Sequence, residues 1–89
     1  MSEIEVQIVN RLGLHARAAA KFVHLANGFE CRVSVCQAES RVDGKSILGL
    51  LTLAARQGAR LRLCTDGPDE QAALAGLAGL IRDRFGEVE

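Results

Sequence analysis

The spacing of apolar residues switches between a period of two and a period of 3.6 along the chain, and the order of these switches constrains the fold more than any other feature. Alternation predicts a strand with one face in water, whereas apolar residues three and four apart predict an amphipathic helix. Strands are predicted at about residues 3–9, 29–37, 40–42 and 59–65, and helices at 16–26, 46–55 and from 69 onward. The order βαββαβα predicts an α+β fold, with a four-stranded antiparallel sheet, all three helices on one face and the other face in water.

Turn and cap residues separate these segments. Asn27-Gly28 is predicted to end the first helix as a left-handed cap pair, and a turn near Ala38 joins the second and third strands. The Ser46 hydroxyl is placed to cap the second helix, and Asp69 begins the last one. The predicted buried stripe of the last helix consists of Leu74, Leu77, Ile81 and Phe85. No linker or repeat interrupts the pattern, so residues 1–89 are predicted to form a single domain.

Size and charge narrow the classes of function. A chain of 89 residues that is 48% hydrophobic can bury one modest core but no deep cleft, which favours a carrier or a binding module. Eleven basic and eleven acidic side chains cancel, so no net field attracts nucleic acid or an anionic membrane. The chain has no apolar run of about 20 residues, and its first residues lack the features of a secretion signal. We therefore expect a cytoplasmic protein.

The cysteines and histidines give no sign of a metal or redox site. Cys31, Cys36 and Cys64 are odd in number and lack CxxC spacing, which indicates reduced thiols. His15 and His24 are nine residues apart on one helix, about 13 Å along its axis, so they cannot share a metal or a proton. We expect no metal and no cofactor.

The segment Gly13-Leu14-His15-Ala16-Arg17 stands at the start of the first predicted helix. The first backbone N–H groups of a helix have no partners inside it and attract an anion. Imidazole is a competent nucleophile near neutral pH, so a phosphoryl group on His15 would meet these N–H groups and the guanidinium of Arg17. The pattern predicts a transient phosphohistidine site, although a lone histidine at a helix start is more often an ordinary surface residue.

The second predicted helix is apolar on nearly every side, but a short helix on a sheet buries only one stripe. We expect Leu50, Leu53 and Ala54 to face the core, and Ile47, Leu48 and Leu51 to remain partly exposed. An exposed apolar patch on so small a domain indicates a docking surface for partner proteins. The alternative is a helix buried all round.

Three segments occur in the expected order of elements: Gly13 to Arg17, Asp43-Gly44-Lys45-Ser46-Ile47-Leu48-Gly49-Leu50, and Gly58-Ala59. Together they resemble the HPr family, the histidine phosphocarriers of the bacterial phosphotransferase system, and equally the nitrogen-branch sibling NPr. The resemblance spans essentially the whole chain. It implies an HPr-like open-faced sandwich with strand order 1-4-2-3.

The resemblance also implies residue roles. His15 would accept a phosphoryl group at Nδ1 from enzyme I, itself charged by phosphoenolpyruvate, and pass it to an EIIA domain of a sugar permease or of the nitrogen branch. Arg17 would steady the phosphate, while Ile47, Leu48 and Leu51 would form the surface that both partners use. Ser46 resembles the residue that HPr kinase/phosphorylase modifies in many relatives. The carrier would be a monomer. It would also be a substrate of its partners and not an enzyme, since it has no Walker loop or Mg²⁺ carboxylate cluster.

One position departs from the family pattern, and one other class of function stays open. The family usually has proline directly after the arginine, where this chain has Ala18. Proline would fix φ at the helix start, so the substitution affects the stiffness of this turn and not the transfer chemistry. The other class is a regulatory module that binds a partner through its second helix without covalent chemistry.

Overall fold

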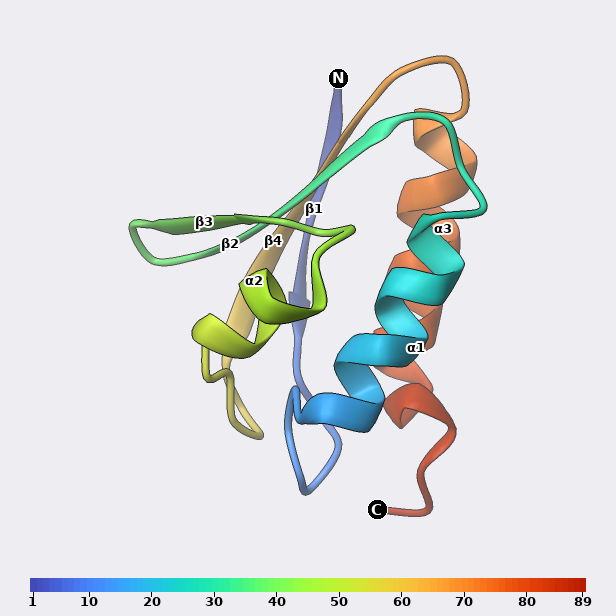
Figure 1. Ribbon diagram of the computed structural model, residues 1–89. Helices are drawn as coiled ribbons and strands as arrows, with labels where there is room; N and C mark the ends of the chain where they lie inside the picture. The colour runs from blue at the N-terminus through green and yellow to red at the C-terminus, as the bar shows by residue number, and fades with distance from the viewer.

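The computed structural model describes all of residues 1–89 and has the predicted βαββαβα order (Figure 1). The strands are β1 (Ser2–Gln7), β2 (Arg32–Gln37), β3 (Ser40–Asp43) and β4 (Arg60–Asp66), and the helices are α1 (Ala16–Ala26), α2 (Ile47–Thr52) and α3 (Glu70–Arg82), followed by the 3₁₀ turn η1 (Arg84–Gly86). The sheet is antiparallel with the order β1-β4-β2-β3, and the helices cover one face. The predicted fold class and strand order are confirmed. No helix combines the length and the apolar character needed to cross a membrane.

The core lies between the sheet and the helices. Leu63 on the central strand β4 stands opposite Ile4 of β1 on one side and Val35 of β2 on the other. Phe22 of α1 and Leu77 of α3 are fully buried over this surface, and α1 and α3 lie side by side in Figure 1. Each such side chain contributes about 1.5–3 kcal/mol of hydrophobic free energy. These contacts hold α1 in a fixed position on the sheet.

The last helix differs from the prediction at two positions of its buried stripe, Leu74 and Phe85, and Phe85 lies beyond α3 in the turn η1. Leu77, Ile81 and Phe85 are buried as predicted, but Leu74 is only partly buried. Ala73 is fully buried one residue earlier. The inward face of α3 is therefore rotated slightly from the one that the large apolar residues suggested.

The second strand is shorter than predicted because the backbone N–H groups at its predicted start donate hydrogen bonds to a side chain. The backbone N–H groups of Glu30 and Cys31 donate to the carboxylate of Asp69, at 2.8 and 3.0 Å, and not to a neighbouring strand. These bonds lower the pKa of Asp69. The ladder of β2 therefore begins only at Arg32, so the predicted start at residue 29 is wrong.

Two predicted helix ends are also wrong in detail. Asn27 has φ −68° and a right-handed conformation, and the Gly28 N–H donates to the Leu25 carbonyl at 3.0 Å, so no left-handed cap ends α1. At the end of α2, Ala54 has φ +50°, which turns the chain outward. Ala54 is therefore exposed, and Ala55 is buried in the place predicted for it.

The outer face of the sheet is not entirely in water. Cys36 and Cys64 point to this face, yet they are only 6% and 4% exposed. The Cys64 thiol donates to Glu3 at 3.7 Å, and burial raises its pKa. All three cysteines are free thiols, as predicted. Burial therefore favours the protonated form of the Cys64 thiol.

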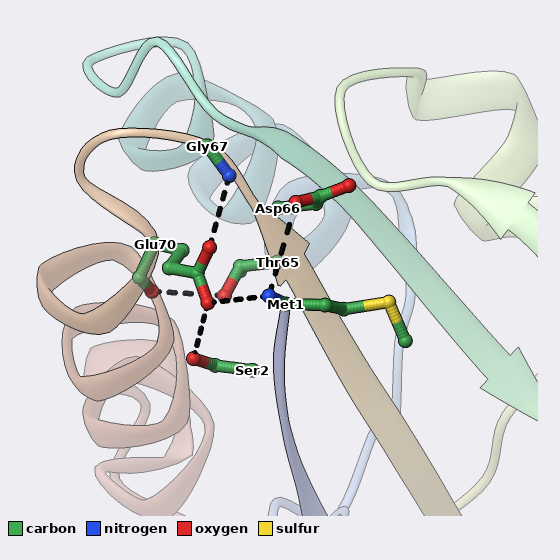
Figure 2. A network of polar contacts seen from close by, with 6 residues as sticks. All are labelled: Met1, Ser2, Thr65, Asp66, Gly67 and Glu70. Carbon is green, nitrogen blue, oxygen red and sulfur yellow. Dashed lines mark hydrogen bonds and ion pairs between the residues drawn. The ribbon is translucent and has the colours of Figure 1, made fainter.

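A polar network ties β1 to the first turn of α3, at the end of the molecule remote from the start of α1 (Figures 1 and 2). The Glu70 carboxylate accepts hydrogen bonds from the Ser2 hydroxyl at 2.6 Å and the Gly67 N–H at 3.2 Å, and lies 3.0 Å from the amino group of Met1. The bond from Ser2 is the largest of the effects that lower the pKa of Glu70 to about 2.

Candidate functional site

The first turn of α1 presents the free N–H groups that the sequence predicted. His15 is the N-cap residue in an extended conformation, with φ −82° and ψ 179°, and its side chain does not cap the helix. The first helical hydrogen bond runs from the Ala19 N–H to the His15 carbonyl at 2.8 Å. The N–H groups of residues 16–18 therefore have no partner in the helix and remain available to an anion beside His15.

The loop before His15 depends on Gly13. This glycine has φ +69°, and a Cβ atom there would lie 2.5 Å from the carbonyl oxygen of Ala55. The same carbonyl accepts the N–H of Leu14 at 2.9 Å. The close approach therefore requires glycine, and it fixes His15 relative to the segment that follows α2.

Glu87 is a residue of this site that the sequence did not indicate. Its Oε2 contacts Nε2 of His15, and its Oε1 accepts a hydrogen bond from Nδ2 of Asn10 at 3.0 Å. Burial alone raises the pKa of Glu87, but the hydrogen bonds from His15 and Asn10 outweigh it, so the pKa lies below that of an ordinary glutamate. The carboxylate is thus ionised at neutral pH and accepts the Nε2–H of His15.

Asn10 supports this contact from inside the molecule. Its side chain is fully buried and also donates to the Gly13 carbonyl at 2.8 Å. One amide therefore connects the glycine loop to the C-terminal segment. This connection fixes Glu87 relative to the loop that precedes His15.

The C-terminal segment returns to His15 through an unusual turn. Arg84, Phe85 and Gly86 have positive φ values of 58°, 54° and 78° in succession. Phe85 is fully buried, and its carbonyl accepts a hydrogen bond from Nζ of Lys21 at 2.7 Å. Figure 1 shows the chain descending past the start of α1. Because Phe85 is held in place by burial and by Lys21, Glu87, two residues later, lies beside His15.

Arg17 lies beside this segment but makes no hydrogen bond or ion pair. It is exposed and lines a hollow of about 260 Å³ together with Glu87 and four further C-terminal or loop residues. Another wall residue, Arg11, pairs with Glu89 at 2.7 Å. The Arg17 guanidinium is therefore free for an anion, close to the carboxylate that holds His15.

The second helix has the exposure that the sequence predicted. Ser46 caps it by accepting the Gly49 N–H at 3.0 Å. Leu50 is fully buried and Leu53 nearly so. The outward residues form what we call the α2 patch: Ile47 at 41% exposed, Leu48 at 77% exposed and Leu51, which is partly buried. The helix is not buried all round, so that alternative is wrong.

The other candidates are not brought into the site. His24 is exposed in the last turn of α1, away from His15. No group of three or more His, Cys, Asp or Glu side chains is arranged to hold a metal ion. The site therefore consists of His15 with Asn10 and Glu87, the adjacent Arg17, and the α2 patch, since α1 and α2 are in contact.

Comparison with known proteins places this geometry in a family. Residues 2–83 match the family model described as the PTS HPr component phosphorylation site. The chain belongs to the HPr family. The phosphocarrier protein HPr of Pseudomonas aeruginosa is 51% identical over 90 residues, with both chains covered completely. The family function is that of a phosphocarrier in the phosphotransferase system.

Solved HPr structures have the same fold. A crystal structure of HPr from Thermoanaerobacter tengcongensis has a TM-score of 0.96 and 39% identity, covering all of both chains. A crystal structure of an HPr dimer from the same organism has a TM-score of 0.78 and 40% identity, covering 98% of this chain and 100% of the other. The arrangement of strands and helices around His15 is thus that of HPr.

Proposed function

We propose that His15 is the phosphoryl acceptor of this chain, taking the group at Nδ1 from phosphoenolpyruvate-charged enzyme I and passing it to an EIIA domain. The observation that carries the proposal is the position of His15 as N-cap, directly before the three free N–H groups of residues 16–18. A phosphoryl group bound there gains hydrogen bonds and the favourable end of the helix dipole. The exposed end of a helix also leaves the phosphorus open to the next nucleophile.

Arg17 is proposed to steady the phosphate. It is exposed, has no partner of its own and lies two residues after His15, in the first turn of α1. A guanidinium offers charge-assisted hydrogen bonds, which are about twice as strong as neutral ones. Arg17→Ala should therefore slow phosphoryl transfer while leaving the acceptor in place.

The α2 patch is proposed as the docking surface for both enzyme I and the EIIA domain. Leu48 is the most exposed of its residues, and a carrier has to offer one surface to its donor and its acceptor in turn. Ser46 at the head of this patch is proposed as a regulatory site for HPr kinase/phosphorylase. A phosphate there would place about two negative charges beside Ile47 and Leu48, which raises the cost of docking through desolvation and repulsion.

The carrier is proposed to act as a cytoplasmic monomer of one domain, residues 1–89, and as a substrate of its partner enzymes. A partly exposed His15 and the exposed part of the α2 patch suit sequential encounters with two partners. Because one HPr of known structure is described as a dimer, sedimentation at several concentrations is the measurement that decides the state of this chain.

Labelled phosphoenolpyruvate with enzyme I tests the central proposal. The chain should acquire an acid-labile phosphate, His15→Ala should acquire none, and the matched variant His24→Ala should acquire as much as the unchanged protein. A binding module that uses the α2 patch without covalent chemistry would acquire no phosphate at all. An adduct that persists in His15→Ala would show that another residue is the acceptor.

A further inference from the structure

The Glu87 carboxylate is held at both oxygens. Asn10, fully buried, donates to Oε1, and the His15 ring contacts Oε2. The side chains of His15 and Glu87 are only 26% and 16% exposed, so water screens the contact weakly. With Oε1 held by Asn10, the carboxylate presents Oε2 to the imidazole of His15.

Building this contact requires an unfavourable backbone. Arg84 and Phe85 adopt left-handed conformations that cost non-glycine residues free energy, and both precede Glu87 closely. The buried ring of Phe85 and the hydrogen bond from Nζ of Lys21 to the Phe85 carbonyl hold them there. Strain of this kind persists where the surrounding structure over-determines it, and it is common at functional sites.

We propose that Glu87 is a positioning residue for phosphoryl transfer: it accepts the Nε2–H of neutral His15 and so leaves the lone pair of the ring on Nδ1. This inference rests on the proposed role of His15. Imidazole carries its single proton on either nitrogen, and the partner of one nitrogen decides which nitrogen is free. A carboxylate that holds a histidine in one tautomer and orientation is an established catalytic device on other folds.

The transfer step then needs no proton to leave His15. The Nδ1 lone pair forms the N–P bond while the bond from phosphorus to the donor atom breaks, and the electron pair of that bond stays with the donor. The ring keeps its proton on Nε2 and becomes positively charged. The adjacent Glu87 carboxylate balances this charge. In onward transfer the Nδ1–P electron pair returns to Nδ1, and the ring is again neutral.

Glu87→Ala tests the proposal, with Glu89→Gln as the matched control because Glu89 is a carboxylate of the same segment that pairs with Arg11. Ring ¹⁵N chemical shifts of neutral His15 report the tautomer without any phosphoryl donor. Phosphoramidate, a small donor that needs no docking surface, reports the reactivity of the ring, and enzyme I reports the complete reaction. Circular dichroism checks the fold, and Asn10 retains its bond to Gly13 in the variant.

We expect the unchanged protein and Glu89→Gln to show His15 protonated on Nε2, and Glu87→Ala to show a mixture of tautomers. The rate of His15 phosphorylation by both donors should fall by about tenfold in Glu87→Ala, the factor expected for one charge-assisted hydrogen bond. Glu87→Asp should recover part of the rate because it restores the charge.

Unchanged ring shifts in Glu87→Ala would overturn the proposal, because Glu87 would then not set the tautomer. An unchanged or faster rate would overturn it as well, since a faster rate identifies Glu87 as a competitor of the phosphoryl group. Failure of the proposed function looks different. The unchanged protein would then take no phosphate at His15 from either donor, while its ring shifts still showed the contact with Glu87.

Discussion

The side-chain oxygen of Ser46 lies 3.0 Å from the backbone nitrogen of Gly49, so the residue at the head of α2 is a working helix cap. The two residues after it, Ile47 and Leu48, are the most exposed of the α2 patch. One side chain therefore stabilises the short helix and borders the proposed docking surface. Substitution separates the two roles.

Ser46→Ala should lower the free energy of unfolding by about 1 kcal/mol, because the Gly49 N–H loses its acceptor. Ser46→Asp should keep the stability, since aspartate is an equally good cap, but it should slow phosphorylation of His15 by enzyme I. Urea unfolding and the transfer rate at two salt concentrations measure these effects. The slowing should diminish as salt rises. Equal rates for Ser46→Asp and the unchanged protein at low salt would limit Ser46 to capping.

Leu48→Glu should weaken binding to both enzyme I and the EIIA domain, because a charge would be desolvated in each interface. The free energy of unfolding should change by no more than about 0.5 kcal/mol, as is usual at exposed positions. The matched variant Leu50→Ala, in the buried stripe of the same helix, should lose about 2–5 kcal/mol. Calorimetric binding and urea unfolding distinguish them. Loss of binding to only one partner would contradict a shared surface.

The fold and the candidate acceptor were predictable because they depend on local pattern. Periodicity located each element, and His15 followed from its place before a helix start. The boundaries depend on contacts distant in sequence. The Asp69 carboxylate accepts hydrogen bonds from the N–H groups of Glu30 and Cys31, which lie 39 and 38 residues earlier. Nothing in the local sequence of those two residues indicates this contact.

Glu87 was not predictable for the same reason. It lies 72 residues from His15, and its position depends on left-handed backbone at Arg84 and Phe85. Both residue types favour other conformations, so no local preference signals the turn. The only available sign was a large apolar residue, Phe85, beyond the last full turn of α3, and it was interpreted as part of the helical stripe.

The Glu70 network predicts a loss of stability in acid. The folded state has a pKa of about 2 at Glu70, below the ordinary value of 4.5, so its contribution is fully present above pH 4.5 and disappears as the pH falls to 2. Glu70→Gln should be less stable than the unchanged protein at pH 7, and the difference should shrink between pH 4.5 and 2.

Urea unfolding at a series of pH values measures this difference. Glu39→Gln, which alters an exposed carboxylate in the turn between β2 and β3, serves as the control and should show no such trend. A difference for Glu70→Gln that stays constant down to pH 2 would show that the hydrogen bonds of Figure 2 do not depend on the charge of Glu70.

The alanine at position 18 gives the last prediction. Ala18 lies in the first turn of α1, before Ala19 closes the first helical hydrogen bond, so its N–H has no helical partner to lose. Ala18→Pro should therefore fold normally and gain about 0.4–1 kcal/mol, because proline restricts the unfolded chain. Ala20→Pro, two residues later, removes an interior helical bond and should lose about 3 kcal/mol. Urea unfolding compares them, and equal losses in both variants would show that the first turn does not tolerate proline in this chain.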